Sequence, residues 1–268
     1  MSKLYKLYAL LFARPFFYKW NFLLLRFSLR GLGILNFYND RVSGEKYFIE
    51  EILPKYVDKN PILIDVGGNI GRFSIMLIEK FPNSKLHIFE PHPLNFKKLI
   101  DCNLPENACI NNMALGKKEG SFEIFDYFEG DGSEHASIYK EVIEDIHGKK
   151  SISHEIKMTT LDRYIHDRNI DKVDFLKVDV EGEELNVFRG SLESINKTLI
   201  KVIQFEFNEM NVWSKTFFID FTNLLNNYNF YRMLPKGLLP LKKYKAVRHE
   251  IFAFQNIVAI RKDIDKEN

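Results

Sequence analysis

An acidic residue and a group of glycines meet where a short apolar run ends. Asp65 closes the run and is followed by Gly67, Gly68, Asn69 and Gly71 in the stretch ILIDVGGNIGRFS. The stretch predicts a strand, a tight turn and a helix, an arrangement whose backbone N–H groups can hold a cofactor. Asn69 stands where the dinucleotide pattern G-x-G-x-x-G has its second glycine, which lets the backbone approach a pyrophosphate. The turn therefore favours a cofactor without a diphosphate.

A second acid follows at the end of the next apolar run. Glu90, followed by Pro91, comes 25 residues after Asp65. An acid at the end of the second strand accepts hydrogen bonds from a ribose diol. The carboxylate of Asp65 would repel a diphosphate but suits the cationic ammonium group of S-adenosylmethionine. Together the two acids predict S-adenosylmethionine as the cofactor. The alternative is that the glycines only form a turn and that Glu90 is a surface carboxylate.

A cation and two carboxylates alternate in the run LKVDVEGEE. Along an extended chain Lys177, Asp179 and Glu181 point to one side. A carboxylate beside an acceptor hydroxyl can act as a general base, so Asp179 or Glu181 is a candidate catalytic residue. The alternative is that Lys177 and Asp179 form a structural ion pair while Glu181 caps the next helix.

Two further candidates depend on groups elsewhere in the chain. His135, in GSEHASIY, is a candidate proton acceptor on a loop, although a loop histidine is commonly only solvated. Asp179, Glu181 and Glu206 together offer oxygen ligands that suit Mg²⁺. Nothing in their spacing requires a metal, so the sequence predicts none.

Short apolar runs alternate with amphipathic stretches from residue 61 onward. This alternation predicts an α/β fold with a parallel sheet and helices on both faces. Residues 120–160 depart from this alternation, and their two strand-like stretches around a polar segment predict a hairpin insertion. The predicted strands are Ile62–Val66, Lys85–Glu90, Ala108–Asn112, Val173–Val180, Ile200–Phe207 and Phe254–Ile260, and the predicted helices are Arg72–Lys80, Leu94–Cys102, Glu183–Arg189 and Lys215–Asn227.

Several of these stretches resemble the FkbM family of S-adenosylmethionine-dependent methyltransferases, from about Gly44 to Lys262. DVGGNIGRFS is similar to the family's first motif, FEPHPLNFKKL to its ribose-binding strand end, and NNMALG to the turn after its third strand. TLDRYI followed by VDFLKVDVEGEELNVFRGS resembles its most characteristic stretch, and VIQFEFNE its fifth strand. Gly68 stands where the family commonly has Ala, and Val178 where Ile is usual; both keep the backbone role.

The resemblance implies a Rossmann-like class I methyltransferase fold. Its seven-stranded, mostly parallel sheet has the order 3-2-1-4-5-7-6, with Phe254–Ile260 as the antiparallel seventh strand. The resemblance and the residue patterns together give the following expected cofactor-binding residues: Asp65, Gly67, Gly68, Asn69, Gly71, Ser74, Glu90, Pro91, Asn112, Ala114 and Asp179.

The expected activity is O-methyl transfer to a hydroxyl of a sugar in a glycan or surface-polysaccharide precursor. A methyltransferase acting on a small-molecule secondary metabolite is the alternative. The missing middle glycine disfavours a nicotinamide-dependent oxidoreductase, and the intact acids disfavour a non-catalytic scaffold. The net charge of +2 indicates no nucleic-acid partner. A basic cluster before the last strand is either a solvated face or attracts an anionic acceptor; it comprises Lys236, Lys242, Lys243, Lys245, Arg248 and His249.

Composition and charge divide the chain into an N-terminal extension (1–43), a methyltransferase domain (44–262) and a polar tail (263–268). Hydrophobic residues make up 46% of the chain, enough for a sizeable core. Cys102 and Cys109 form no CxxC pair, so we expect reduced thiols in a cytoplasmic protein.

The N-terminal extension is basic and rich in aromatic residues. It carries six basic residues before Asp40, the first acid. Between Lys3 and Arg30 the longest uncharged run, 7–13, is too short to cross a bilayer. Phe16, Trp20 and Phe27 belong to an apolar stripe with helical spacing, and Pro15 separates this helix from a shorter one. The stripe predicts a cap packed on the domain or a helix resting on an anionic membrane surface, and the two can coexist in one protein. The second would be peripheral contact at the inner face of the membrane.

Overall fold

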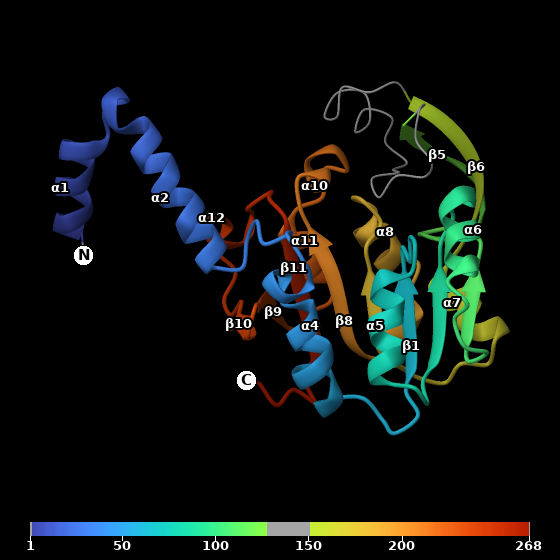
Figure 1. Ribbon diagram of the computed structural model, residues 1–268. Helices are drawn as coiled ribbons and strands as arrows, with labels where there is room; N and C mark the ends of the chain where they lie inside the picture. Colours follow the sequence, from blue (N-terminus) through green and yellow to red (C-terminus); the bar gives the residue numbers. More distant parts are fainter. Residues whose placement is uncertain (1, 128–150, 268) are drawn as a thin grey trace.

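The protein is described by a computed structural model over residues 2–127 and 151–267. Its centre is an eight-stranded sheet in the order β10-β9-β11-β8-β7-β1-β2-β3 (Figure 1). The parallel strands β3, β2, β1, β7 and β8 are continued by β11, which is antiparallel to both of its neighbours, β8 and β9. The strands are β1 Ile62–Val66, β2 Lys85–Phe89, β3 Ala108–Asn111, β7 Val173–Val178, β8 Ile200–Phe207, β9 Tyr228–Leu234, β10 Gly237–Pro240 and β11 Gln255–Arg261.

Seven of these strands confirm the expected order 3-2-1-4-5-7-6, with β11 as the antiparallel strand. The strand count was wrong by one. After Pro235 and Lys236 the chain turns back, and β10 pairs antiparallel with β9 from Gly237 opposite Leu234. Neither β9 nor β10 stood out in the sequence, because β9 mixes polar and apolar residues and β10 is only four residues long.

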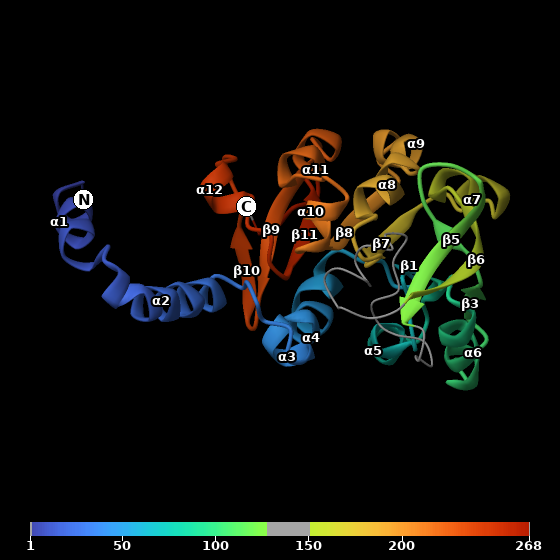
Figure 2. The same ribbon diagram turned by 90° about the horizontal axis from the view of Figure 1, so that it is seen from above.

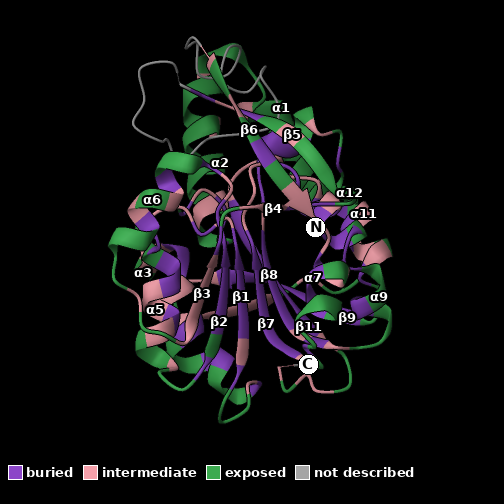
Figure 3. Ribbon diagram, turned by 90° about the vertical axis from the view of Figure 1, so that its right-hand side faces the viewer, coloured by how far each residue is buried: buried purple, intermediate pink, exposed green. Residues whose placement is uncertain are grey.

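Helices cover both faces of the sheet, because neighbouring strand residues point to opposite sides. Leu63 packs with the segment 48–53, α5 and α6, whereas Ile64 packs with α7, α8, α9 and α11. Figure 3 shows the strands buried between these layers. The covering helices are α4 Glu45–Tyr47, continued by Phe48–Ile52 and Leu53–Lys55, α5 Arg72–Lys80, α6 Pro93–Asp101, α7 Leu161–Asp167, α8 Glu184–Arg189, α9 Leu192–Asn196 and α11 Phe218–Leu224.

The predicted hairpin insertion is present as a second, three-stranded sheet in the order β4-β6-β5. The long strands β5 Gly120–Tyr127 and β6 Ser151–Thr159 are antiparallel, and β4 Ala114–Leu115 pairs with β6. This sheet stands beside the carboxyl ends of the parallel strands (Figure 1). The candidate His135 lies outside the described residues.

The N-terminal extension forms two helices, α1 Ser2–Phe12 and α2 Tyr18–Gly31, joined by the turn Pro15–Phe17. They project away from the sheet (Figures 1 and 2). The expected cap is therefore wrong: the side chains of Phe16, Trp20 and Phe27 are 88%, 54% and 63% exposed. Within the described part of the chain, no helix has the length and apolarity needed to cross a bilayer.

Three short helices complete the described chain. They are α3 Asp40–Ser43, α10 Met210–Trp213 and α12 Ala246–His249. The C-terminal residues pack back on the sheet, since Asp265 accepts hydrogen bonds from Asn229 and Tyr231.

Candidate active site

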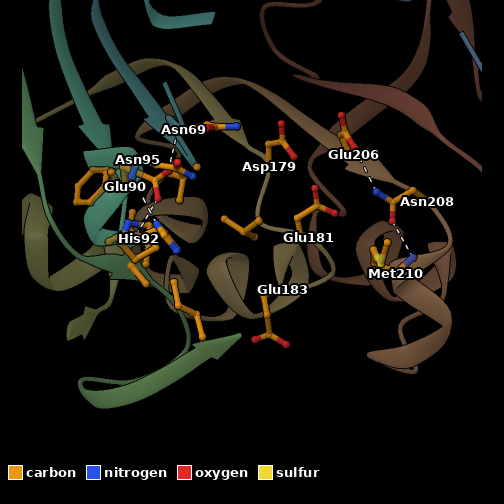
Figure 4. Close-up of a pocket in the computed structure, with 18 of the residues that line it drawn as sticks. Asn69, Glu90, His92, Asn95, Asp179, Glu181, Glu183, Glu206, Asn208 and Met210 are labelled. Atoms are coloured by element: carbon orange, nitrogen blue, oxygen red, sulfur yellow. Dashed lines mark hydrogen bonds between the residues drawn. The ribbon is translucent and has the colours of Figure 1, made fainter. Parts of the chain in front are cut away.

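A cavity of about 600 Å³ opens beyond the carboxyl ends of β1, β2, β7 and β8. Ligands of open α/β sheets bind at this edge, next to the point where the strand order reverses. Figure 4 shows Asn69, Glu90 and His92 on one side of the cavity, Glu181 and Glu206 on the other, and Asp179 between them. The strand ends thus bring together residues that lie far apart in the sequence.

The glycine turn connects β1 with β2 rather than offering its first N–H groups to a ligand. The N–H groups of Gly67 and Gly68 both donate to the Phe89 carbonyl, at 2.9 Å each. These two N–H groups are therefore not free to bind an anion. Asn69 has a left-handed backbone (φ 47°) and lines the cavity, where its buried Oδ1 has no hydrogen-bond partner among the described residues.

Glu90 lies at the end of β2 with a nearly buried carboxylate that lines the cavity. Its Oε1 accepts the N–H of His92 at 2.8 Å and its Oε2 that of Asn69 at 2.7 Å. Each carboxylate oxygen has a second lone pair, so two further donors such as ribose hydroxyls can still be accepted. Burial raises the pKa of Glu90 to about 7, against the opposing effect of the two backbone donors.

The backbone that follows Glu90 is held by Asn112. The Asn112 amide donates to the carbonyls of Glu90 and Pro91, at 2.9 and 3.2 Å. Asn112 itself is exposed and outside the cavity wall, whereas Pro91 and Ala114 belong to that wall. Asn112 is therefore placed to position this loop rather than to touch a ligand.

Asp65 lies behind the cavity wall, where it cannot contact the ammonium group of a cofactor in the cavity directly. Its carboxylate is fully buried and absent from the cavity wall, with Oδ2 accepting from Ser74 Oγ at 2.6 Å. Its Oδ1 is 3.8 Å from the Lys177 ammonium, because the two residues are in register on β1 and β7. Burial raises the pKa of Asp65, and Lys177 opposes this shift. This corrects the expectation of direct contact: the helix above β1 covers Asp65.

Lys177 is also buried behind the wall, where its ammonium donates to Asp179 Oδ2 at 2.9 Å. It lies 4.8 Å from the centre of the Phe73 ring. Burial lowers the pKa of Lys177, but Asp179, Asp65 and Glu45 outweigh it and the net shift is upward. Lys177 thus forms the expected ion pair with Asp179, as a positioning residue.

Asp179 and Glu181 both face the cavity. The Asp179 N–H donates to the Val66 carbonyl at 2.9 Å, which fixes the loop to β1. Glu181 has φ 51°, a costly backbone conformation for a residue with a side chain, of the kind that clusters at functional sites. The N-cap position of α8 is taken by Glu183 rather than by Glu181.

The residue that holds this loop is Glu184, which the sequence analysis did not single out. Its buried Oε1 accepts the N–H groups of Val180 and Gly182, at 3.1 Å each. Burial raises the pKa of Glu184 to about 8. Its place three residues after Glu181, at the first turn of a helix, was the one available signal.

Glu206 follows the same face of the sheet from β8 and adds a third carboxylate near Asp179 and Glu181. Its Oε2 accepts from the Asn208 amide at 3.2 Å. Burial raises the pKa of Glu206 well above its usual range, and the charges of Asp179 and Glu181 raise it further. Across the described chain, no group of three or more His, Cys, Asp or Glu residues is arranged to hold a metal.

Two more acids and a histidine that were not among the expected site residues support the site. Glu45, from α4, accepts hydrogen bonds from Ser43 and Gln204 and lies near Lys177. His92 Nε2 lies 3.1 Å from Asp126 Oδ2, which ties the second sheet to the start of α6. Both side chains of this pair are nearly fully buried.

The structure divides the expected site residues into two groups. Those in the cavity wall are Gly67, Asn69, Glu90, Pro91, Ala114, Asp179 and Glu181. Those outside it are Asp65, Gly68, Gly71, Ser74, Asn112 and Lys177. The described residues of the wall include six acidic side chains and no lysine or arginine. The acidic residues are Glu90, Asp179, Glu181, Glu183, Glu206 and Glu209.

The chain is similar to curated methyltransferases over about half of its length. It is 29% identical over 157 residues to methyltransferase sdnD of Sordaria araneosa, covering 49% of this chain and 60% of that protein. It is 26% identical over 164 residues to the hexuronic acid methyltransferase AglP of Haloferax volcanii, covering 60% of this chain and 63% of that protein. The chain thus spans less than two thirds of the length of these relatives.

A solved structure and a protein family also match. The crystal structure of methyltransferase FkbM from Methylobacillus flagellatus KT aligns with a TM-score of 0.44 and 14% identity, covering 75% of this chain and 44% of that one. The methyltransferase FkbM domain family matches residues 65–231, which include the last two residues of β1, the glycine turn and the carboxylates at the ends of β2, β7 and β8. The chain belongs to the FkbM methyltransferase family.

Proposed function

We propose that the protein transfers a methyl group from S-adenosylmethionine to a hydroxyl of a neutral sugar, in a precursor of a glycan or surface polysaccharide. One observation carries this proposal: six carboxylate side chains and, among the described residues, no lysine or arginine line the cavity. Such a surface favours a cationic cofactor and disfavours an anionic acceptor.

The cavity contains groups that suit both ends of S-adenosylmethionine, which supplies a methyl group on a positively charged sulfur. Glu90 would accept the ribose hydroxyls, and Asn69 Oδ1, buried without a partner among the described residues, would accept from the same ligand. Asp179, fixed by Lys177, would lie toward the cationic end. In this arrangement Asp65 acts from behind the wall by holding Lys177.

The acceptor side of the cavity would orient a hydroxyl and receive its proton. Positioning of the acceptor oxygen in line with the methyl carbon supplies much of the rate enhancement. Asp179 or Glu181 would take the proton as general base. Glu206, whose raised pKa favours the protonated form, would donate a hydrogen bond to a neighbouring oxygen of the acceptor.

The relative named as a hexuronic acid methyltransferase supports a sugar acceptor, but a free carboxylate is a poor fit for this cavity. The basic cluster around Lys242 and Lys243 does not line the cavity, so it offers no counter-charge there. A neutral sugar presents several hydroxyls that can donate to the carboxylates of the wall.

Two experiments test the proposal in order, and a third identifies the natural acceptor. Calorimetry should show that S-adenosylhomocysteine binds and that NAD does not. The opposite result would overturn the assignment of S-adenosylmethionine as the cofactor. The rates of transfer of a labelled methyl group to neutral sugars and to uronic acids are then compared. Faster transfer to the uronic acids would overturn the proposal of a neutral sugar acceptor. Mass spectrometry of cell-surface glycans with and without the protein identifies the natural acceptor.

A further inference from the structure

We propose that the two N-terminal helices dock the protein on the surface of an anionic lipid bilayer. We call residues 2–31, which form α1, the turn Pro15–Phe17 and α2, the arm. The arm lies beside the domain without covering the sheet (Figures 1 and 2).

The arm exposes large apolar side chains that no other described element of the chain covers. Phe16 is 88% exposed, Phe27 63% and Trp20 54%, and no residue of α2 is buried. Contiguous exposed apolar surface of this kind marks a contact with a protein or a membrane. Phenylalanine and tryptophan side chains suit the boundary between lipid headgroups and acyl chains.

The charge of the arm selects the partner. All its charged residues are basic, and no acid precedes Asp40. Lys19, Arg26 and Arg30 are spaced by seven and four residues, so they follow one line along α2 beside the Trp20 and Phe27 stripe. A basic line next to an aromatic face is the pattern of helices that lie in the interface of an anionic membrane.

The arm is a formed structure. Tyr8 donates to Asn21 Oδ1 at 2.6 Å, and the Asn21 amide donates to the Phe12 carbonyl at 2.9 Å, so α1 and α2 hold each other at a fixed angle. At the base of the arm, the Arg30 guanidinium donates to the Leu35 carbonyl at 2.9 Å and the Asn36 amide to the Arg30 carbonyl at 3.1 Å.

The base of the arm continues directly into the wall of the cavity. Leu35 and Phe37 line it, together with Phe254. Leu35 has φ 63°, which is costly for a residue with a bulky side chain, and its N–H donates to the Phe254 carbonyl at 2.8 Å. A bilayer below the arm would therefore lie close to the entrance for the acceptor.

A second copy of this chain is the competing occupant of the apolar face. In a two-fold contact the same surface meets itself. Two arms would then bring two identical sets of cations together with no acid in either arm. An anionic bilayer instead supplies both the apolar layer and the opposite charge, and for this reason we assign the arm to the bilayer.

Tryptophan fluorescence tests the docking directly, because Trp20 and Trp213 are the two tryptophans of the chain. The full chain carrying Trp213→Phe keeps Trp20 as its single reporter. It is mixed with vesicles of phosphatidylcholine, or of equal parts phosphatidylcholine and phosphatidylglycerol. With the anionic vesicles we expect a blue shift of the Trp20 emission, quenching by brominated acyl chains, and weaker binding as salt is raised.

Charge variants provide the matched comparison. Lys19→Gln with Arg26→Gln should lower the vesicle partition coefficient about 30-fold, since each basic residue near an anionic surface contributes about fivefold. Lys80→Gln with Lys85→Gln removes the same charge from exposed positions at the opposite edge of the sheet and should leave binding unchanged. Trp20→Glu should abolish co-sedimentation and leave the thermal midpoint unchanged, because Trp20 is exposed.

Three outcomes would overturn the proposal. The first is no quenching of Trp20 by either vesicle at low salt. The second is equal loss of binding in both double variants, which would indicate a response to net charge alone. The third is a dimeric mass by light scattering that Trp20→Glu converts to a monomeric mass, without vesicle binding, which would assign the apolar face to a second copy.

Discussion

Gly67 packs directly on the backbone of Asp179: a Cβ at position 67 would lie 1.8 Å from the Asp179 carbonyl oxygen. Gly67 also has φ 86°, a conformation that favours glycine. The glycine turn after β1 and the loop after β7 that carries Asp179 therefore touch without any side chain between them. Whatever moves one of these loops must move the other.

Gly67→Ala should consequently damage both loops. The left-handed conformation and the contact with Asp179 together should lower the free energy of unfolding by at least about 2 kcal/mol. Gly31→Ala is the matched control, because a Cβ at Gly31 meets nothing within 4 Å. Thermal unfolding of the two variants measures the difference; equal midpoints would contradict the close approach.

Lys177→Met should destabilise the protein by about 3–5 kcal/mol, because it leaves the fully buried Asp65 without its cation. The double variant Lys177→Met with Asp65→Asn removes the unpaired charge and should regain part of the stability, and the single variant Asp65→Asn completes the cycle. Lys236→Met, at an exposed position, is the control. Denaturant unfolding of this set gives the coupling energy between the two residues, and a coupling of zero would show that they do not interact.

The affinity for S-adenosylhomocysteine should depend on pH through Glu90. Ribose hydroxyls donate to the ionised carboxylate, so bound ligand favours the charged form. With a pKa of about 7 in the free protein, the affinity is full above pH 7 and is lost as pH falls, by about tenfold between pH 8 and pH 6. Calorimetry at several pH values measures the slope.

The Glu90 variants isolate this effect from the other titrating groups. Glu90→Ala should weaken S-adenosylhomocysteine binding by about 1.5–3 kcal/mol, the loss of hydrogen bonds to a charged group. Glu90→Gln should remove the Glu90 part of the pH dependence. Unchanged affinity in a folded Glu90→Ala variant would rule out the ribose contact.

The amide variants Asp179→Asn and Glu181→Gln separate proton transfer from cofactor binding. They keep the side-chain shape and remove the base, so at least one should lower turnover about 100-fold or more. In the variant whose turnover falls, the affinity for S-adenosylhomocysteine should change little. If both variants methylate the acceptor at the native rate, the base lies elsewhere, and His135 becomes the next residue to replace.

The sequence by itself determined the strand ends that carry the site. The order of Asp65, Glu90 and Asp179 along the chain, each at the end of an apolar run, placed all three at one edge of the sheet, because parallel strands end on the same side. The hairpin insertion and both N-terminal helices were also readable, since hydrophobic periodicity is a local property.

The tertiary structure decided which of these strand ends face the cavity and which are covered by other elements. Asp65 and Glu90 are both acids after an apolar run, yet α5 covers the first and leaves the second open to the cavity. Glu45 reaches Lys177 across more than a hundred residues of sequence. No local pattern encodes such contacts, because they depend on how separate elements pack.

Gly68 is a second example of a contact that the sequence alone does not reveal. From the sequence, alanine would serve at this position equally well, but a Cβ would lie 2.3 Å from Cγ2 of Ile88 on the neighbouring strand. The direction of the arm is a third case: its aromatic stripe fits a cap as well as a free surface, and only the turn at its base directs it away from the domain. Periodicity fixes which side of an element is apolar, whereas the packing of distant elements fixes what that side meets.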